Sequence, residues 1–165
     1  MSKKFLVAYF SCSGVTAKVA KSLVQLVDAD IYEIKPEIPY TDADLNWRDN
    51  QSRSSIEMND PSYRPGIIGK VSNMDDYDAV FVGFPIWWYV APTIINTFLE
   101  TYDFSGKKII PFATSGGSNL GQTVEKLKSS CSDTVTWFPG KLLNGRISKE
   151  ILAEWINKLK IGRAH

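Results

Sequence analysis

A turn rich in hydroxyl groups lies between an apolar segment and an amphipathic one near the start of the chain. Residues 5–10 (FLVAYF) form a run typical of a strand that a parallel sheet buries on both faces. The turn that follows holds Ser11, Ser13, Gly14 and Thr16. Beyond it we predict a helix, because apolar residues recur at the helical period at Val15, Val19, Leu23, Leu26 and Val27.

This turn has the features of a phosphate site. The first turn of a helix has N–H groups without backbone partners, and the aligned peptide dipoles leave partial positive charge there. Gly14 lets the backbone turn tightly and approach a ligand, and Lys18 adds a weak cationic field. A purely structural interpretation is open as well, because Ser13 is also a favoured residue for capping a helix.

The rest of the chain alternates between strand-like and helix-like segments. Further strands are predicted at residues 31–34, 77–84, 108–114 and 134–138. One helix is predicted to begin near Pro92, with an apolar face formed by Ile94, Ile95, Phe98, Leu99 and Tyr102. A short helix is predicted around Val124 and Leu127. The last helix is predicted to begin at Ser148, with a hydrophobic staple between Ile147 and Leu152 and with Trp155, Ile156 and Leu159 facing inward. Strands alternating with helices predict a doubly wound α/β fold with a five-stranded parallel sheet. At 165 residues and 44% hydrophobic content, we expect one domain over residues 1–165.

A long polar segment, residues 35–76, separates the second and third predicted strands. It holds four prolines, and its apolar periodicity is poor, so we expect mostly irregular structure. Thr41 is a candidate cap for a helix from Asp42, but the pattern does not assign that helix firmly. A stretch of this length is either functional or a solvated excursion, and the sequence leaves both interpretations open.

Three loops are expected to converge on one ligand. In doubly wound sheets, ligands bind outside the carboxyl ends of the strands, at the point where the strand order reverses. Aromatic side chains after the third strand can stack on a flat ring, unless they serve only for packing or as a dimer surface. Glycines after the fourth strand leave room for backbone amides to meet the polar edge of that ring. The candidate binding residues are Ser11, Cys12, Ser13, Gly14, Val15 and Thr16 in the first loop, Pro85, Ile86, Trp87, Trp88 and Tyr89 in the second, and Thr114, Ser115, Gly116 and Gly117 in the third.

Two of these loops resemble those of the flavodoxins and the flavodoxin-fold quinone reductases. Residues 11–16 match the flavodoxin phosphate-loop pattern of hydroxyl, any, hydroxyl, Gly, any, Thr. Residues 84–92 are similar to the flavin loop of the quinone reductases, with Phe84, Pro85, Trp88 and Pro92 at that family's spacing. The resemblance covers nearly the whole chain except residues 35–76. It implies a flavodoxin-like sheet in the order 2-1-3-4-5 and noncovalent FMN, whose flavin performs the redox chemistry, so that no catalytic side chain is expected.

Two departures from the electron-carrier flavodoxins leave the reaction open. Residues 85–89 contain no glycine, whereas many carriers have one there whose peptide flips when the flavin takes one electron. Carriers are also usually strongly acidic, whereas this chain has 19 Lys and Arg against 18 Asp and Glu. We expect electron transfer through bound FMN, with NAD(P)H-dependent quinone reduction as the alternative. A binding module that has lost flavin is a third possibility.

The electron partner is expected to be a redox protein or a small-molecule donor or acceptor. A reductase must cover its flavin with a pocket for a small acceptor. Tyr40, Trp47, Arg48 and Arg53, all in the polar segment, are candidates for such a pocket or for binding a nicotinamide phosphate. Their spacing does not fix where they lie.

Missing motifs exclude several other classes of protein. Cys12 invites comparison with low-molecular-weight phosphatases, but Lys18 stands where those enzymes have an arginine, and lysine lacks the bidentate fork. No carboxylate follows the first strand, as a response-regulator receiver would need. There is no P-loop and no Gly-x-Gly-x-x-Gly fingerprint. The single histidine, His165, and two cysteines give no pattern for a metal site, so none is expected.

The charge and hydropathy of the chain bound its surroundings. A formal charge of +1 argues against broad attraction to nucleic acid. No apolar run reaches the roughly 18 residues that a membrane span requires, and no signal peptide precedes the first strand. We therefore expect a cytoplasmic protein without membrane insertion, as a monomer or a homodimer.

Overall fold

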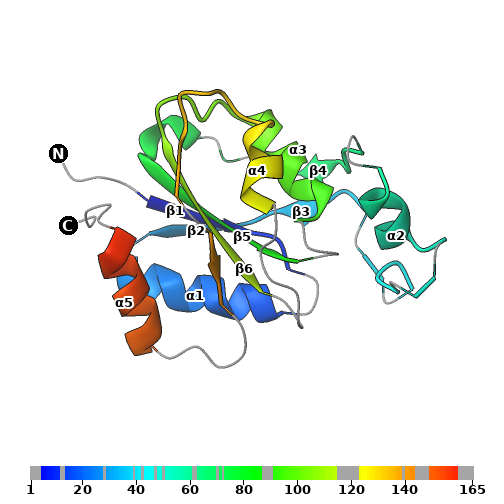
Figure 1. The fold of residues 1–165 in the computed structure, drawn as a ribbon, viewed down its shortest axis with the longest axis horizontal. Helices are drawn as coiled ribbons and strands as arrows, with labels where there is room; N and C mark the ends of the chain where they lie inside the picture. Colours follow the sequence, from blue (N-terminus) through cyan, green and yellow to red (C-terminus); the bar gives the residue numbers. More distant parts are fainter. Residues whose placement is uncertain are drawn as a thin grey trace.

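Apolar strands at the centre of the molecule form a parallel sheet, which helices cover on both faces (Figure 1). The computed structural model describes residues 5–11, 14–27, 29–38, 40–41, 43–46, 48–49, 51–60, 63–69, 71, 73–86, 91–114, 123–138, 140–143 and 149–159. The strands of the main sheet are β1 (Phe5–Tyr9), β2 (Asp30–Glu33), β5 (Ala79–Pro85), β6 (Lys108–Thr114), β7 (Thr136–Trp137) and β8 (Lys141–Leu142). Every pairing between them is parallel.

The order of the sheet is β2-β1-β5-β6-β7, which confirms the predicted order 2-1-3-4-5. The predicted fifth strand, residues 134–138, is found as the shorter β7, and a further short strand that was not predicted, β8, makes the sheet six-stranded. β7 pairs with the start of β6, and β8 pairs with its end. Pro139, which lies outside the described residues, falls between β7 and β8 in the sequence, and proline has no N–H to donate to a ladder.

The two faces of the sheet carry separate layers of helix. Figure 1 shows α1 (Val15–Val27) and α5 (Lys149–Leu159) on one side, and α3 (Thr93–Thr101) and α4 (Thr123–Lys128) on the other. On the first side, the ring of Trp155 meets the ring of Phe81 edge to face at 5.9 Å. On the second, Ile94 and Phe98 are fully buried against the sheet, as their spacing predicted. The central strands β1, β5 and β6, which the helices cover on both faces, are accordingly buried along almost their whole length, whereas the edge strand β2 is mostly exposed.

The inward face of α1 begins one residue later than predicted. Val15 was expected on the apolar face, but its side chain is 44% exposed. Thr16 is buried instead, with only 2% exposed, and Val19, Leu23 and Val27 continue the same stripe. The buried residues of α1 keep the helical spacing, but the series starts at Thr16 and not at Val15. A polar hydroxyl therefore occupies the first buried position of the helix.

The polar segment contains more regular structure than its sequence predicts. β3 (Lys35–Pro36) and β4 (Ile67–Ile68) pair antiparallel as a second, two-stranded sheet. Along the chain, α2 (Arg53–Met58) comes between these two strands, and a 3-10 helix, η1 (Met74–Asp76), precedes β5. No helix begins at the Thr41 cap in the described residues. Thr41 and Asp44 instead close a turn by exchanging hydrogen bonds between side chain and backbone N–H, at 3.0 and 3.1 Å.

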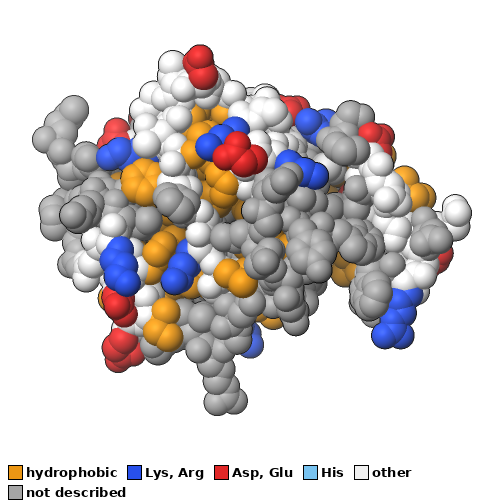
Figure 2. Space-filling view, in the orientation of Figure 1, with side chains coloured by type: hydrophobic (Ala, Val, Ile, Leu, Met, Phe, Trp, Pro, Cys, Tyr) orange, Lys and Arg blue, Asp and Glu red, His pale blue; other side chains and the backbone are white. Residues whose placement is uncertain are grey.

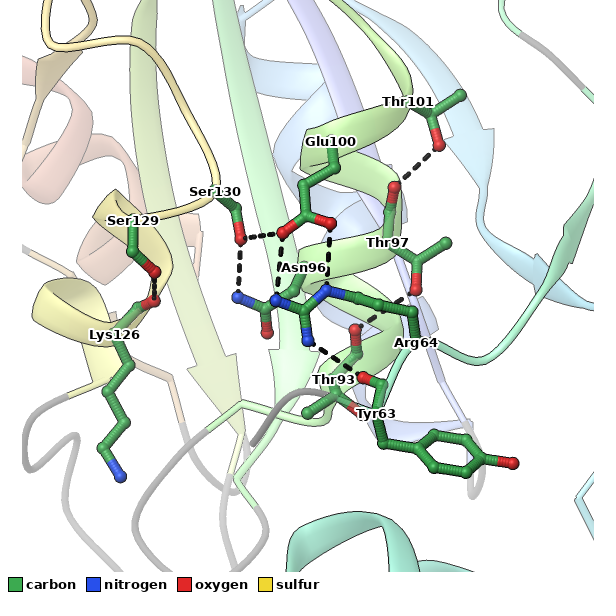
Figure 3. Close-up of polar contacts among 10 residues, drawn as sticks. All are labelled: Tyr63, Arg64, Thr93, Asn96, Thr97, Glu100, Thr101, Lys126, Ser129 and Ser130. Atoms are coloured by element: carbon green, nitrogen blue, oxygen red, sulfur yellow. Dashed lines mark hydrogen bonds and ion pairs between the residues drawn. The ribbon is translucent and has the colours of Figure 1, made fainter. Parts of the chain in front are cut away.

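An ion pair joins the returning part of the polar segment to α3 (Figure 3). The guanidinium of Arg64 donates to both carboxylate oxygens of Glu100, at 2.9 and 3.0 Å. Ser130 Oγ also donates to Glu100, at 2.8 Å, and accepts from Asn96 Nδ2 at 2.8 Å. These bonds connect the polar segment, α3 and the end of α4 at one point.

The Glu100 contacts predict a pH dependence of stability. The hydrogen bond from Arg64 lowers the pKa of Glu100, the bond from Ser130 acts in the same direction, and partial burial opposes them. Because the folded-state pKa lies below the unfolded one, this stabilisation is present above the unfolded pKa and is lost as the pH falls through the folded value. Both side chains are partly exposed, so we expect Glu100→Gln to cost less than about 1 kcal/mol at neutral pH.

Urea unfolding of Glu100→Gln and of the wild type, measured from neutral to acidic pH, tests this expectation. The difference in unfolding free energy should shrink as the pH falls. Added salt should also reduce it at neutral pH. A difference that is independent of both pH and salt would contradict the role given to the ion pair.

The surface shows no large field of one sign in the view of Figure 2. Acidic and basic side chains are interspersed over the described part of that face, with apolar side chains between them. The formal net charge of +1 agrees with this distribution. Within the described ranges, every helix is too short or too polar to cross a bilayer.

Candidate functional site

The turn from β1 into α1 is closed by its own polar groups. Gly14 has a φ of +92°, a conformation that L side chains rarely adopt. Its N–H donates to Ser11 Oγ at 3.1 Å, and its carbonyl accepts from the N–H of Lys18, also at 3.1 Å. The bond from Lys18 to Gly14 is the first backbone hydrogen bond of α1, so the N–H groups of residues 15–17 have no acceptor within the helix. The turn presents backbone donors and hydroxyls at the carboxyl end of β1.

A hydrogen bond joins this turn to the end of β6. The hydroxyls of Thr16 and Thr114 are 2.7 Å apart, and the two side chains are 2% and 4% exposed. Either oxygen can be the donor. Thr16 belongs to the first predicted loop and Thr114 to the third, so the fold brings parts of both loops into contact across 98 positions of sequence.

The second predicted loop begins beside the third. β5 and β6 pair in register along their whole length, so Pro85 and Thr114 are partners at the carboxyl edge. The N–H of Ile86 donates to the carbonyl of Thr114 at 2.8 Å. The N–H of Phe10 donates to the carbonyl of Gly83 at 2.9 Å, which holds the end of β1 to β5. The ends of three adjacent strands thus lie at one edge.

The described members of the predicted site therefore lie at one edge of the sheet, and their binding role remains a prediction. Val15 is among them, at the exposed start of α1. The other candidates lie outside the described residues. They are Cys12, Ser13, Trp87, Trp88, Tyr89, Ser115, Gly116 and Gly117.

A buried hydroxyl without a partner stands at the start of α3. Thr93 is the first residue of that helix and follows the second predicted loop. Its Oγ1 is buried and has no hydrogen-bond partner among the described residues. Pro92, which precedes it, supplies no side-chain cap. Such a hydroxyl at the ligand edge suits a polar group of a ligand. Thr93 was not among the predicted site residues, although its place directly after Pro92, at the expected start of a helix, is visible in the sequence.

Two of the residues predicted for an acceptor pocket, Tyr40 and Arg53, lie in contact, and their role in such a pocket stays a prediction. The guanidinium carbon of Arg53 lies 3.8 Å from the centre of the Tyr40 ring. Both side chains also bond to the carboxylate of Glu57, which is 1% exposed: the Tyr40 hydroxyl donates to Oε1, and Arg53 Nε donates to Oε2 at 2.9 Å. Glu57 was missed from the sequence, although its spacing from Arg53 is that of a helical ion pair.

A family model described as flavodoxin matches residues 4–159 of the chain. The chain belongs to the flavodoxin family. This confirms the resemblance that the loop sequences predicted. The fold of this flavodoxin agrees with that assignment, because its strand order is the one the resemblance implied.

Solved structures resemble this flavodoxin over nearly its full length. A protein of Bacteroides eggerthii DSM 20697, assigned to the flavoproteins, is 46% identical, with a TM-score of 0.91 over 96% of this chain and 99% of that one. A second, from Bacteroides uniformis ATCC 8492, is 47% identical, with a TM-score of 0.89 over 95% and 99%. A flavoprotein of Lactobacillus acidophilus NCFM, solved in complex with FMN, is 25% identical, with a TM-score of 0.69 over 86% and 93%. No match was found among curated protein sequences.

Proposed function

We propose that this flavodoxin binds FMN noncovalently at the carboxyl edge of its sheet and mediates electron transfer through it. The observation that carries the proposal is the bond between Thr16 and Thr114, which joins the predicted phosphate loop to the start of a predicted flavin loop. The FMN complex of the Lactobacillus acidophilus flavoprotein supports FMN as the cofactor. The family assignment supports it independently.

The described residues fit the phosphate of FMN. The open N–H groups at the start of α1 and the positive end of its dipole favour an anion. Ser11 Oγ accepts from Gly14 and keeps its own proton to donate. Together these groups hold a phosphate with neutral donors and a helix dipole. The buried hydroxyl of Thr93, for which the described residues supply no hydrogen-bond partner, offers a further polar group at the start of α3.

When bound, the flavin takes up and releases the electrons. The chain binds and orients it. If the Thr114 hydroxyl donates to Thr16 Oγ1, the proton of Thr16 is free to point at a phosphate oxygen. Thr114 would then position Thr16. Ile86, which is buried and bonded to the Thr114 carbonyl, helps to exclude water from this edge.

Absorbance spectra of the purified protein, with and without added FMN, test this proposal. We expect a flavin band that remains with the protein, or quenching of FMN fluorescence at micromolar protein. Riboflavin, which lacks the phosphate, should bind more weakly. A protein that shows neither band nor quenching would be the binding module that has lost flavin, and the proposal would fail.

The Thr16 and Thr114 pair gives a quantitative prediction. Removal of one neutral hydrogen bond costs about 0.5–1.5 kcal/mol, so Thr16→Ala and Thr114→Val should each weaken FMN binding by up to about tenfold. The double variant should lose less than the two single losses combined, because both act through one contact. Thr114→Ser is the matched control and should keep the wild-type affinity. Riboflavin affinity should be unchanged in all four variants, and equal losses for FMN and riboflavin would contradict the assignment of this contact to the phosphate.

Quinone reduction with NAD(P)H is a second candidate function. It is supported by the formal net charge of +1, by the mixed acidic and basic side chains on the described part of the face in Figure 2, and by a pocket beside Ser11. Stopped-flow mixing with NADPH and then a quinone discriminates between the two functions. Rapid flavin bleaching and turnover favour the reductase. Reduction only through a separate reductase protein favours the carrier. A bound flavin that dithionite reduces, but that neither NADPH nor a reductase protein reduces, would exclude both the carrier and the quinone reductase.

A further inference from the structure

The chain between residues 38 and 65, the hinged segment, leaves the domain and returns to it through one two-stranded neck. β3 and β4 form this neck, and just beyond their pairing the N–H of Glu37 donates to the carbonyl of Gly66 at 2.9 Å. In Figure 1, α2 lies beyond the neck, on the side of the molecule toward which the strands of the main sheet run. A segment whose two ends lie side by side can turn about them as a hinge, while the rest of the fold stays in place.

Buried polar contacts hold the hinged segment together from within. Glu57, on α2, is 1% exposed and accepts from the Tyr40 hydroxyl and from Nε of Arg53, the latter at 2.9 Å. Nη1 of Arg53 also donates to the carbonyl of Ile38 at 2.6 Å. Loss of one partner of a buried charge is costly, because the other charge is then left uncompensated. These contacts therefore tie α2 to the chain that leaves β3, and the two form one body.

More exposed contacts hold the hinged segment to the domain. On the returning side of the neck, Arg64 reaches Glu100 on α3, and the two side chains are 32% and 41% exposed (Figure 3). On the outgoing side, the ring of Tyr40 meets the ring of Phe10, at the end of β1, edge to face with centres 5.6 Å apart. An ion pair this exposed contributes little to stability. The hinged segment is therefore held to the domain less firmly than it is held together.

The hinged segment adjoins the turn that the proposed function assigns to the phosphate of FMN. A pocket of about 290 Å³ lies between them, and its lining includes Tyr40 of the hinged segment, Ile68 of the neck, and Phe10 and Ser11 at the end of β1. Ser11 is the first residue of the predicted phosphate loop. We propose that the hinged segment is a lid, which opens about β3 and β4 and thereby controls the rate at which FMN enters and leaves. This inference rests on the proposed function and adds the regulation of the same site.

The pair of Arg64 and Glu100 is the latch of this lid. Ser130 Oγ donates to Glu100 at 2.8 Å and so fixes the carboxylate on the side of the domain. Arg64 lies two positions before Gly66, so loss of the pair frees the chain close to the hinge. Salt screens an exposed ion pair, so a rise in ionic strength shifts the lid toward its open state.

The lid controls the rate of exchange and not the affinity for FMN. The groups assigned to FMN lie in the turn of residues 11–16, in α1, at the end of β6 and at the start of α3, and none of them belongs to residues 38–65. Bound FMN therefore keeps these contacts whether the lid is open or closed, and a ligand with equal affinity for two states does not shift their balance. Association and release both pass through the open state, so a weaker latch speeds both by the same factor.

Glu100→Gln removes the charge of the latch, and Glu125→Gln is the matched control. Glu125 pairs with Lys128 at 3.1 Å, and this exposed pair joins two residues of α4 only. FMN association is followed by stopped-flow quenching of its fluorescence, and release by dilution of the complex far below its Kd. At low salt, Glu100→Gln should raise both rate constants about two- to fivefold and leave the Kd unchanged, whereas Glu125→Gln should match the wild type. At high salt, the wild type should approach the rates of Glu100→Gln.

Methyl relaxation dispersion of the isoleucine-labelled apoprotein reports the opening without FMN. Ile68 lines the pocket together with the Tyr40 ring, so the shift of its methyl group changes when the lid moves. Exchange at Ile68 should be larger in Glu100→Gln than in the wild type, and Ile94, which is fully buried in the core, should show none.

A faster release without a faster association overturns the inference, because the lid would then be a binding contact and not a gate. Equal effects of Glu100→Gln and Glu125→Gln, or an Ile68 methyl group without exchange in both proteins, overturn it as well. If FMN does not bind at all, the proposed function fails, while exchange at Ile68 in the apoprotein still tests the opening of the lid.

Discussion

Gly83→Ala is expected to lower the free energy of unfolding by about 3 kcal/mol, the upper part of the usual range for overpacking a core. A Cβ built on Gly83 would lie 2.2 Å from Cζ of Phe112 and 2.4 Å from Cε2. Gly83 and Phe112 are partners on β5 and β6, and the ring is fully buried, so it has no solvent to move into. In a domain of this size, such a loss corresponds to a fall in melting temperature of about 6–12 °C.

Thermal unfolding of Gly83→Ala, Phe112→Leu and the double variant measures this clash directly. Leucine lacks the outer atoms of the ring, so it should relieve the contact. The double variant should therefore be more stable than the sum of the single losses predicts. Strict additivity would show that the added methyl group is accommodated elsewhere and that the ring does not require the glycine.

Gly14→Val is expected to weaken FMN binding by about 10- to 100-fold, which corresponds to a backbone strain of roughly 1–3 kcal/mol. The strain arises because Gly14 has a φ of +92°. A Cβ at this position would meet no atom within 4 Å among the described residues, so the cost is conformational and not a clash. The apoprotein can relax out of this conformation, and FMN binding must then restore it.

Titration of FMN fluorescence measures that affinity, and the melting temperature of the apoprotein serves as the control. The apoprotein of Gly14→Val should melt close to the wild type. The FMN affinity of Gly14→Ala should fall between those of the wild type and Gly14→Val, because alanine lacks the β-branch of valine. Riboflavin should be affected less than FMN. If the apoprotein loses as much stability as the complex, the turn is structural and does not report on the phosphate.

The central part of the fold could be predicted because its signals are local. The strand at residues 108–114 has the bounds that its apolar run predicts, and α3 opens directly after Pro92. The apolar face of α3 is confirmed at Ile94 and Phe98. Val15 shows the limit of such reasoning. Periodicity gives the spacing of a buried stripe, but the contact between helix and sheet decides which residue begins it.

The polar segment was harder to predict because α2 reverses the usual pattern. It exposes Ile56 and buries Ser54, Ser55 and Glu57. A hydrophobic periodicity therefore finds no helix there, although Ser52 caps it by accepting from the N–H of Ser55. The burial of Glu57 depends on Tyr40 and Arg53, and the contact with Tyr40 spans 17 positions. Long-range pairing of this kind has no local signature.

For the candidate site, the sequence predicts the edge of the sheet but not the contacts within it. Thr16 and Thr114 were each assigned to a loop at that edge. Their hydrogen bond depends on the register between β5 and β6 and on the position of α1 over β1, neither of which the sequence shows. The orphaned hydroxyl of Thr93 likewise becomes visible only when the burial of its surroundings is known.

Among the described residues, the small sheet of β3 and β4 shares no strand pairing with the main sheet. Side-chain contacts tie the described parts of the polar segment to the main domain, among them the Arg64 pair with Glu100 and the bond from the N–H of Val71 to the Tyr102 hydroxyl. A few substitutions at such contacts can change this segment without altering the register of the parallel strands. The polar segment is therefore a separate structural module, and substitutions within it can leave the edge that carries Thr16 and Thr114 in place.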